Sequence, residues 1–99
     1  MRTYATESIS VGVTAVGLTA SNLVLPENSQ RPGAGAEISV IGAPIMFSTL
    51  QGTDPTSTTG QYVAAGNRVI LDNTELKAFK AISYDGNTAT LNVEYKTDI

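Results

Sequence analysis

Short runs in which apolar and polar residues alternate dominate this 99-residue chain. Between about residues 4 and 18, Ile9, Val11 and Val13 alternate with small polar residues, which is the pattern of a half-buried strand. Glycines inside this run indicate a bulge or a bend. The alternation predicts that one face of the segment is buried and the other is exposed.

Further strands are predicted in the second half of the chain. Their ranges are 37–41, 45–48, 61–63, 68–71, 79–83 and 88–95. Pro44 cannot donate to a ladder, so it should open its strand or lie on an edge. Gly66-Asn67 predicts a hairpin-type turn, and Asp85-Gly86 between two alternating segments is the strongest hairpin signal of the chain.

One segment, residues 74–82, allows two interpretations. Leu76, Phe79 and Ile82 have the spacing of a short helix, and the candidate N-caps before them are Asp72, Asn73 and Thr74. The predicted hairpin at Asp85-Gly86, however, requires residues 80–83 to be extended. We therefore predict a turn over residues 73–77 followed by a strand, with the short helix as the alternative.

Together these signals predict an all-β protein: a small single-domain β-sandwich or jelly-roll-like barrel of seven to eight short antiparallel strands. The domain spans residues 1–99, with 1–7 as a candidate extended N-terminal arm. Residues 27–35 and 52–60 are rich in Gly, Pro, Asn and hydroxyl side chains and predict surface loops. The side chains expected to face inward are Ile38, Val40, Ile45, Phe47, Val69, Leu71, Phe79, Ile82, Leu91 and Val93.

The residue types most used in catalysis are missing. The chain has no His, Cys or Trp, which excludes disulfides, thiolate nucleophiles, imidazole bases and the usual zinc sites. The turns at Asp54 and Asp85 lack the alternating carboxylates of a calcium loop, and no glycine-rich segment matches a phosphate-binding motif. We expect no catalytic residues, no metal and no cofactor, and therefore not an enzyme.

The charges exclude further classes. Six Lys and Arg are scattered among nine Asp and Glu, for a net charge of −3, so no basic patch for nucleic acid is expected. No continuous apolar run predicts a membrane span or a secretory signal. With 13 Thr and 8 Ser and only 15% charged residues, the polar surface is built mostly from hydroxyls. Such a surface is typical of secreted β-proteins and virion proteins.

Three tyrosines are candidates for aromatic contacts: Tyr62, Tyr84 and Tyr95. They are expected at strand ends with their rings inside and their hydroxyls in water or at an interface.

A series of motifs in fixed order covers about two thirds of the chain. It runs A-x-I-S-V from Ala36, A-P-I-x-F from Ala43, G-T-D-P-T-x-x-x-G from Gly52, A-G-N-x-V-x-L from Ala65, E-L-K-A-F-K-A-I from Glu75 and A-T-L-N-V-E-Y from Ala89. In this order the chain resembles small virion-associated structural proteins of tailed bacteriophages. The resemblance implies a β-sandwich of the capsid decoration (cement) kind and carries no catalytic residues.

The resemblance implies a capsid decoration protein that binds the outer shell and bridges neighbouring capsid subunits. The implied partner is the major capsid protein, and the implied location is the outer capsid surface of a virion whose proteins are made in the host cytoplasm. A homotrimer would match three-fold lattice positions. The alternative is a small receptor- or carbohydrate-binding module on a phage fibre or spike, using the 52–60 loop and Tyr62. The expected contact residues are Arg2, Thr3, Tyr4, Glu27, Asn28, Gln30, Arg31, Asp54, Thr56 and Tyr62.

Overall fold

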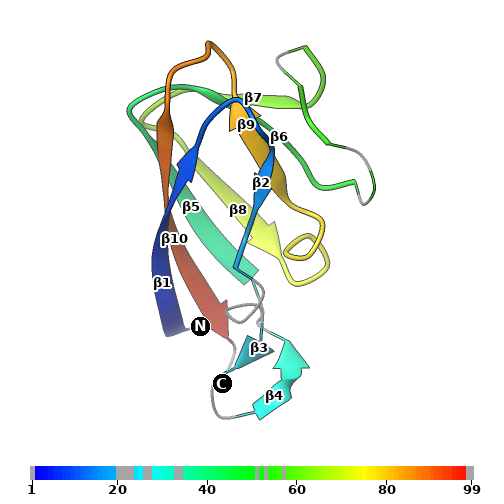
Figure 1. The fold of residues 1–99 in the computed structure, drawn as a ribbon. Helices are drawn as coiled ribbons and strands as arrows, with labels where there is room; N and C mark the ends of the chain where they lie inside the picture. The colour runs from blue at the N-terminus through cyan, green and yellow to red at the C-terminus, as the bar shows by residue number, and fades with distance from the viewer. Residues whose placement is uncertain are drawn as a thin grey trace.

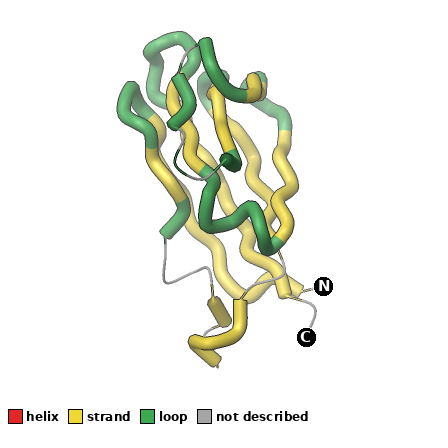
Figure 2. Tube along the Cα trace, turned by 90° about the vertical axis from the view of Figure 1, so that its right-hand side faces the viewer, coloured by secondary structure: helices red, strands yellow, loops and turns green. Residues whose placement is uncertain are grey.

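The computed structural model describes residues 2–19, 24–25, 28–32, 35–50, 52, 54–56 and 58–97. These residues form ten strands and no helix, which confirms the predicted all-β class (Figures 1 and 2). The strands are β1 (Arg2–Val11), β2 (Val16–Gly17), β3 (Val24–Leu25), β4 (Asn28–Pro32), β5 (Gly35–Ile41), β6 (Ile45–Ser48), β7 (Gln61–Val63), β8 (Arg68–Asp72), β9 (Lys80–Ser83) and β10 (Ala89–Thr97). A helix able to cross a membrane is therefore not found in the described part of the chain.

Eight of these strands form two antiparallel sheets that face each other as a sandwich. Sheet A has the order β1-β10-β5-β8, and sheet B has the order β2-β9-β6-β7. The short strands β3 and β4 pair with each other at the end of the molecule where both termini lie (Figure 1). The predicted sandwich is thus confirmed, with β3 and β4 added to the eight strands of the two sheets.

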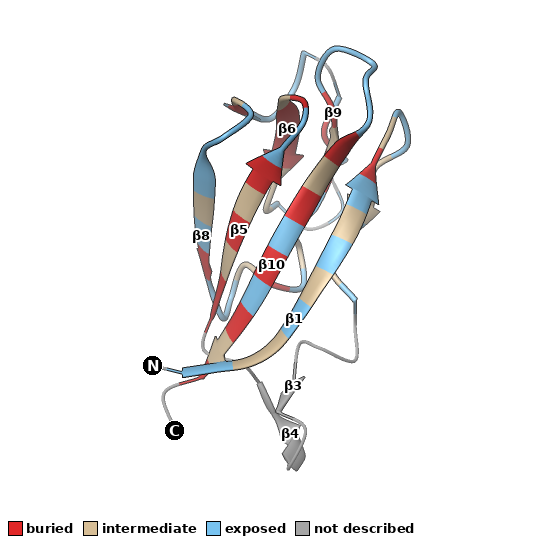
Figure 3. Ribbon diagram, turned by 90° about the vertical axis from the view of Figure 1, so that its left-hand side faces the viewer, coloured by how far each residue is buried: buried red, intermediate tan, exposed pale blue. Residues whose placement is uncertain are grey.

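Strand β10 is one of the two central strands of sheet A and shows the predicted alternation most clearly. Its buried and outward positions follow each other along the strand (Figure 3). Ala89, Leu91, Val93 and Tyr95 face sheet B and are at most 1% exposed. The ring of Tyr95 lies inside, as expected. Its hydroxyl was expected in water or at an interface, but it is buried too, because the inward period of β10 carries the whole side chain into the core.

Strand β6 of sheet B is buried on both of its faces. Ile45, Met46 and Phe47 are all below 9% exposed, although successive side chains of a strand point to opposite sides. The chain between β6 and β7 folds back over the outer face, where Pro55 is fully buried. Gly60 brings this segment close to β6: a Cβ at Gly60 would lie 2.8 Å from the Phe47 carbonyl oxygen.

The core lies between the two sheets and agrees with most of the prediction. Phe47 and Phe79 pack with ring centroids 5.6 Å apart. Val69 is half-buried. Ile82 faces outward, so the inward position predicted for Ile82 is wrong. The reason is the pairing of Phe47 with Ala81, which sets the small Ala81 side chain inward beside the Phe47 ring and turns Ile82 away. The inward positions confirmed are Ile38, Val40, Ile45, Phe47, Leu71, Phe79, Leu91 and Val93.

The two predicted hairpin turns form, but neither joins paired strands. The Asp85-Gly86 turn leads from β9 in sheet B to β10 in sheet A, and the Gly66-Asn67 turn leads from β7 in sheet B to β8 in sheet A. Gly66 and Gly86 both have the positive φ expected of such turns, 91° and 86°. The hairpin prediction is therefore wrong about pairing, because the flanking strands find their hydrogen-bond partners elsewhere.

The ambiguous segment before β9 is a turn followed by a strand. Residues 73–78 form successive turns, and β9 begins at Lys80. The Asp72 carboxylate accepts hydrogen bonds from the N–H groups of Thr74 (3.0 Å) and Glu75 (3.1 Å), and the Glu75 carboxylate accepts one from the Asp72 N–H (3.0 Å). This reciprocal capping closes the turn without a helix beyond it.

Three predictions about the first third of the chain need correction. Residues 2–7 are no extended arm, because Arg2 pairs with Thr97 and the rest of β1 continues along β10 up to Val11 opposite Ala89. The strand expected over residues 4–18 ends at Val11, and the chain then bends across to sheet B. The loop expected over residues 27–35 contains β4, which pairs with β3. A partner far away in the sequence, β10, decides the course of β1, whereas β4 pairs with its sequence neighbour β3.

Candidate functional site

A groove of about 420 Å³ opens beside the end of sheet B that lies opposite the chain termini. Three segments meet there: the bend after β1, the loop between β6 and β7, and the end of β9 with its following turn. The residues that line the groove are Val13, Thr56, Ile82, Ser83, Tyr84 and Gly86. We take this groove as the candidate functional site.

The alternation along β9 decides which side chains reach the groove. Ala81 and Ser83 point into the core, so Ile82 between them points outward. Ile82 lies opposite Met46 of β6, and Met46 lies opposite Tyr62 of β7. These three side chains form one apolar row across the outer face of sheet B.

Backbone hydrogen bonds hold the end of β9 between two neighbouring segments. The Ser83 N–H donates to the Gly12 carbonyl at 2.8 Å, and the Tyr84 N–H donates to the Pro44 carbonyl at 3.1 Å. Val13 directly follows Gly12 and is thereby held next to Tyr84 at the groove. Both side chains remain open to solvent, with 73% of Val13 and 45% of Tyr84 exposed.

Two tyrosines form an exposed aromatic pair at the border of the groove. The rings of Tyr62 and Tyr84 meet edge to face, with centroids 4.8 Å apart and planes at 78°. This geometry contributes about 0.5–1.5 kcal/mol beyond the burial of ring area, so each ring helps to orient the other. Tyr62 is 55% exposed. The pair therefore offers solvent two oriented rings with their hydroxyls, as partner-binding surfaces often do.

The turn after Tyr84 is stabilised by its own side chains. The Asp85 carboxylate accepts a hydrogen bond from the Asn87 N–H at 3.0 Å, and this bond is the main reason why the pKa of Asp85 lies below its ordinary value. The Ser83 hydroxyl donates to the Asn87 carbonyl at 2.6 Å. Because both bonds close the turn locally, the wall of the groove formed by Gly86 has a defined shape.

The opposite wall comes from the loop between β6 and β7. The Thr56 hydroxyl accepts hydrogen bonds from the N–H groups of Thr58 (3.2 Å) and Thr59 (3.0 Å), which makes Thr56 the centre of a tight turn. Asp54 forms an ion pair with Lys80 of β9 at 3.1 Å. Pro55, between Asp54 and Thr56, is buried. The loop is thus fastened to sheet B by the Asp54–Lys80 ion pair, while Thr56 closes the turn within the loop.

The chemistry available in the groove is apolar contact and hydroxyl hydrogen bonding. Among the described residues, those that line the groove carry no carboxylate, ammonium or guanidinium group. Among the residues that the structure describes, no group of three or more His, Cys, Asp or Glu side chains comes together as a metal site would require. The arrangement is suited to binding a surface or a neutral ligand.

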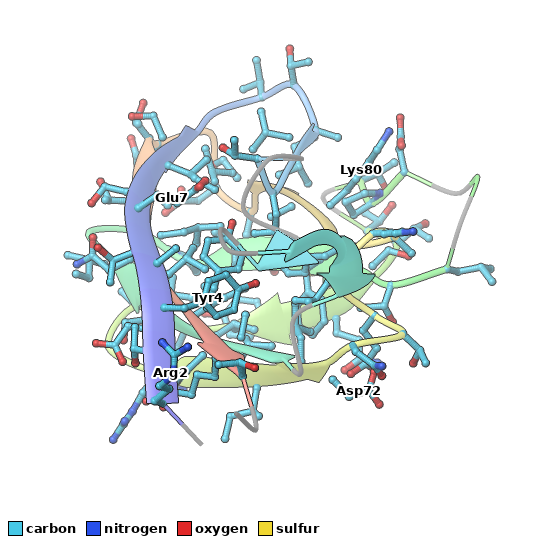
Figure 4. All side chains as sticks on the ribbon, turned by 90° about the horizontal axis from the view of Figure 1, so that it is seen from below. Arg2, Tyr4, Glu7, Asp72 and Lys80 are labelled. Carbon is cyan, nitrogen blue, oxygen red and sulfur yellow. The ribbon has the colours of Figure 1, made fainter. Side chains whose placement is uncertain are left out.

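The contact residues predicted from the sequence divide between two ends of the sandwich. Thr56 lines the groove, Tyr62 borders it, and Asp54 lies on the same loop. Arg2, Thr3 and Tyr4 begin β1 at the end with the termini. Seen from that end, Arg2 and Tyr4 lie on the left of the molecule and Lys80 and Asp72 on the right (Figure 4). Asn28, Gln30 and Arg31 lie in β4 at that same end, and Glu27 lies outside the described residues.

The N-terminal candidates differ in exposure. Arg2 and Thr3 are exposed, and the Thr3 hydroxyl is 3.3 Å from the Lys96 ammonium, which donates to it. Tyr4 is half-buried and packs on Tyr95 with ring centroids 6.2 Å apart, and this burial raises its pKa. Tyr4 is thus placed mainly to cover the core.

Five of the six residues that line the groove were not among the predicted contacts: Val13, Ile82, Ser83, Tyr84 and Gly86. Val13 and Ile82 were assigned to buried strand faces, because alternation alone does not show where a strand ends or which face turns inward. For Tyr84 a usable signal existed, since it directly precedes the Asp85-Gly86 turn and shares its aromatic character with Tyr62. Their proximity depends on β6, which lies between their strands.

Comparison of the chain with protein-family models, with curated proteins and with solved structures found no match.

Proposed function

We propose that this protein is a non-enzymatic structural protein of a bacteriophage virion: a capsid decoration (cement) protein that binds the outer shell through the aromatic groove. The observation that carries the proposal is the exposed Tyr62–Tyr84 pair beside a groove that is also lined by the exposed Val13. Clustered exposed apolar side chains of this kind mark interaction surfaces. The motif order of the chain supplies the virion setting.

The distribution of candidate contacts supports a bridging role. A subunit that links two capsid subunits needs two separate contact surfaces. The groove with Thr56 and Tyr62 lies at one end of the sandwich, and exposed Arg2 and Thr3 lie towards the other. With a longest dimension of 39 Å, the molecule is long enough for its ends to touch different neighbours. Many identical weak contacts then add up over the shell through multivalency.

The proposal is tested by co-sedimentation with undecorated shells. Replacing both tyrosines, Tyr62→Ala with Tyr84→Ala, removes the aromatic pair, and we expect binding to fall by at least about 30-fold, the effect of losing an interface hot spot. The matched control is Ile41→Ala, because Ile41 is exposed on the outer face of sheet A, away from the groove. Circular dichroism melts should show that both variants remain folded.

Salt dependence gives a second criterion. Because the lining residues that the structure describes carry no ionised side chain, raising the salt concentration to 0.5 M should change binding only modestly. The proposal fails if the double tyrosine variant binds shells as well as the parent. It also fails if moderate salt abolishes binding by the parent, since the contact would then lie on charged groups elsewhere.

A second candidate is a receptor- or carbohydrate-binding module on a fibre or spike. The same Tyr62–Tyr84 pair favours it, because exposed aromatic rings with adjacent hydroxyls can stack on a sugar and hydrogen-bond to it. Labelling the protein in intact particles distinguishes the two functions by electron microscopy. Many copies on the shell are expected for decoration, and a few copies at the tail for adhesion.

A further inference from the structure

The four outer strands of the two sheets differ in how far their free edges are protected. In sheet B the edge strands β2 and β7 have only two and three residues. In sheet A, β1 carries a bulge between Thr3 and Ala5, and its Glu7 shares the inward face with Val93. Short length, bulges and inward charges all discourage pairing with another chain. Strand β8, with five residues in unbroken register to β5, has none of these devices.

The ladder between β5 and β8 shows which backbone groups face the free edge. The Val40 N–H donates to the Asn67 carbonyl at 3.0 Å, and these two residues continue the register of the β5–β8 pair. Hydrogen-bonded pairs alternate in an antiparallel ladder, so Val69 and Leu71 direct their backbone groups to β5. The N–H and C=O groups of Arg68, Ile70 and Asp72 consequently point away from the sheet.

The side chains along this edge are complementary to themselves. Ile70 is 79% exposed at the centre of β8. Two residues before it stands Arg68, which also forms an ion pair with Glu37 of its own chain, and two residues after it stands Asp72, whose carboxylate also caps the following turn. If a second copy is placed antiparallel about Ile70, each Arg68 lies opposite the partner's Asp72 and the two Ile70 side chains face each other. On the inner face Val69 then meets the partner's Leu71. Apolar residues thus meet apolar ones, and opposite charges meet.

We infer that β8 pairs antiparallel with β8 of a second copy of this chain, about a two-fold axis at Ile70. The two Ile70 residues exchange backbone hydrogen bonds, and each Arg68 N–H reaches the second lone pair of the partner's Asp72 carbonyl, which also accepts from the Glu75 N–H of its own chain at 3.2 Å. The Asp72 N–H stays with the Glu75 carboxylate, which ends the pairing. The two copies of sheet A become one continuous sheet, and the inference does not depend on the proposed function.

The size of the contact sets its strength. Five residues on each side bury less than the roughly 1,200 Å² of a stable complex, so the dimer is expected to be weak and dependent on concentration. A two-fold dimer also differs from the trimer expected from lattice symmetry. Its contact is the same patch on both copies, whereas a trimer needs two different patches.

A cysteine crosslink tests both the contact and its register. The chain has no cysteine, so Ile70→Cys introduces a single thiol. Residues of a hydrogen-bonded antiparallel pair have Cα atoms about 5.5 Å apart, within the range of a disulfide. Under mild oxidation at 100 μM, we expect Ile70→Cys to form a covalent dimer. The control is Ile41→Cys, at an exposed site on the same face but on β5, and it should stay monomeric.

Sedimentation velocity of the unmodified chain from 10 μM to 1 mM provides a readout without crosslinking. We expect a dimer fraction that grows with concentration and is lost in Ile70→Lys, which sets two like charges opposite each other, but kept in Ile41→Lys. Any of three results overturns the inference. These are a monomer at all concentrations, equal crosslinking of the two cysteine variants, and a trimer that Ile70→Lys leaves unchanged.

Discussion

Phe79 provides the most direct test of the packing between the two sheets. Its side chain is 1% exposed and its ring lies 5.6 Å from that of Phe47, near the centre of the core. Phe79→Ala removes a buried ring that the surrounding strands cannot refill, and such changes cost about 3–5 kcal/mol. A domain of this size has a total stability of about 5–15 kcal/mol. The variant should therefore melt at least about 12 °C below the parent.

The contrasting change is Ile82→Ala, on the same strand segment. Ile82 faces outward and is half-buried, so its truncation should cost only about 1 kcal/mol. Urea unfolding followed by circular dichroism measures both variants, and equal slopes of the two transitions would show that the unfolded states are comparable. If Ile82→Ala destabilises the protein as much as Phe79→Ala, the register of β9 is the opposite of the one described.

Three other predictions concern a glycine, a capping carboxylate and the first strand. Gly60 has φ 128° and a Cβ there would lie 2.8 Å from a carbonyl oxygen, so Gly60→Ala should cost more than about 1 kcal/mol, whereas Gly12→Ala, with open space around it, should change the melting temperature little. Hydrogen bonds, chiefly from the Thr74 hydroxyl, lower the pKa of Asp72. The contribution of Asp72 to stability is therefore complete above the unfolded-state pKa of about 3.9 and is lost as the pH falls through the lower folded-state pKa. Between pH 6 and pH 2, the melting temperature should fall less for Asp72→Asn than for the parent. Deleting residues 1–6 removes the β1 residues that pair with the C-terminal half of β10 and uncovers Tyr95. Denaturant titration should therefore show that the free energy of unfolding falls by at least about 2 kcal/mol. Unchanged stability would mean that the sheet does not need this part of β1.

The candidate site could be predicted from the sequence only in part. Thr56 and Tyr62 were identified from a hydroxyl-rich loop and an aromatic strand, and both lie at the groove. Val13 and Tyr84 were missed as contacts, because nothing local shows that residues about seventy positions apart lie side by side. What joins them is the backbone bond from Ser83 to Gly12.

The sequence by itself determined where most strands and turns lie. Period-two alternation located β5 to β10 within a few residues, Pro44 stands directly before β6, and the Asp72 carboxylate caps the turn that follows β8. These features depend on neighbours within a few positions, whose side-chain preferences act in any context. Local chemistry was therefore sufficient for the all-β class and for the turns.

Only the tertiary structure decided which strands pair and which faces are buried. The strands on either side of Asp85-Gly86 belong to different sheets, and β1 pairs with β10, where the Ser8 hydroxyl donates to the Asn92 amide oxygen at 2.7 Å across 84 positions. A strand forms its hydrogen bonds with whichever neighbour also allows its apolar face to be covered. That choice depends on the whole core at once, which is why Ile82 faces the groove and Ala81 faces Phe47.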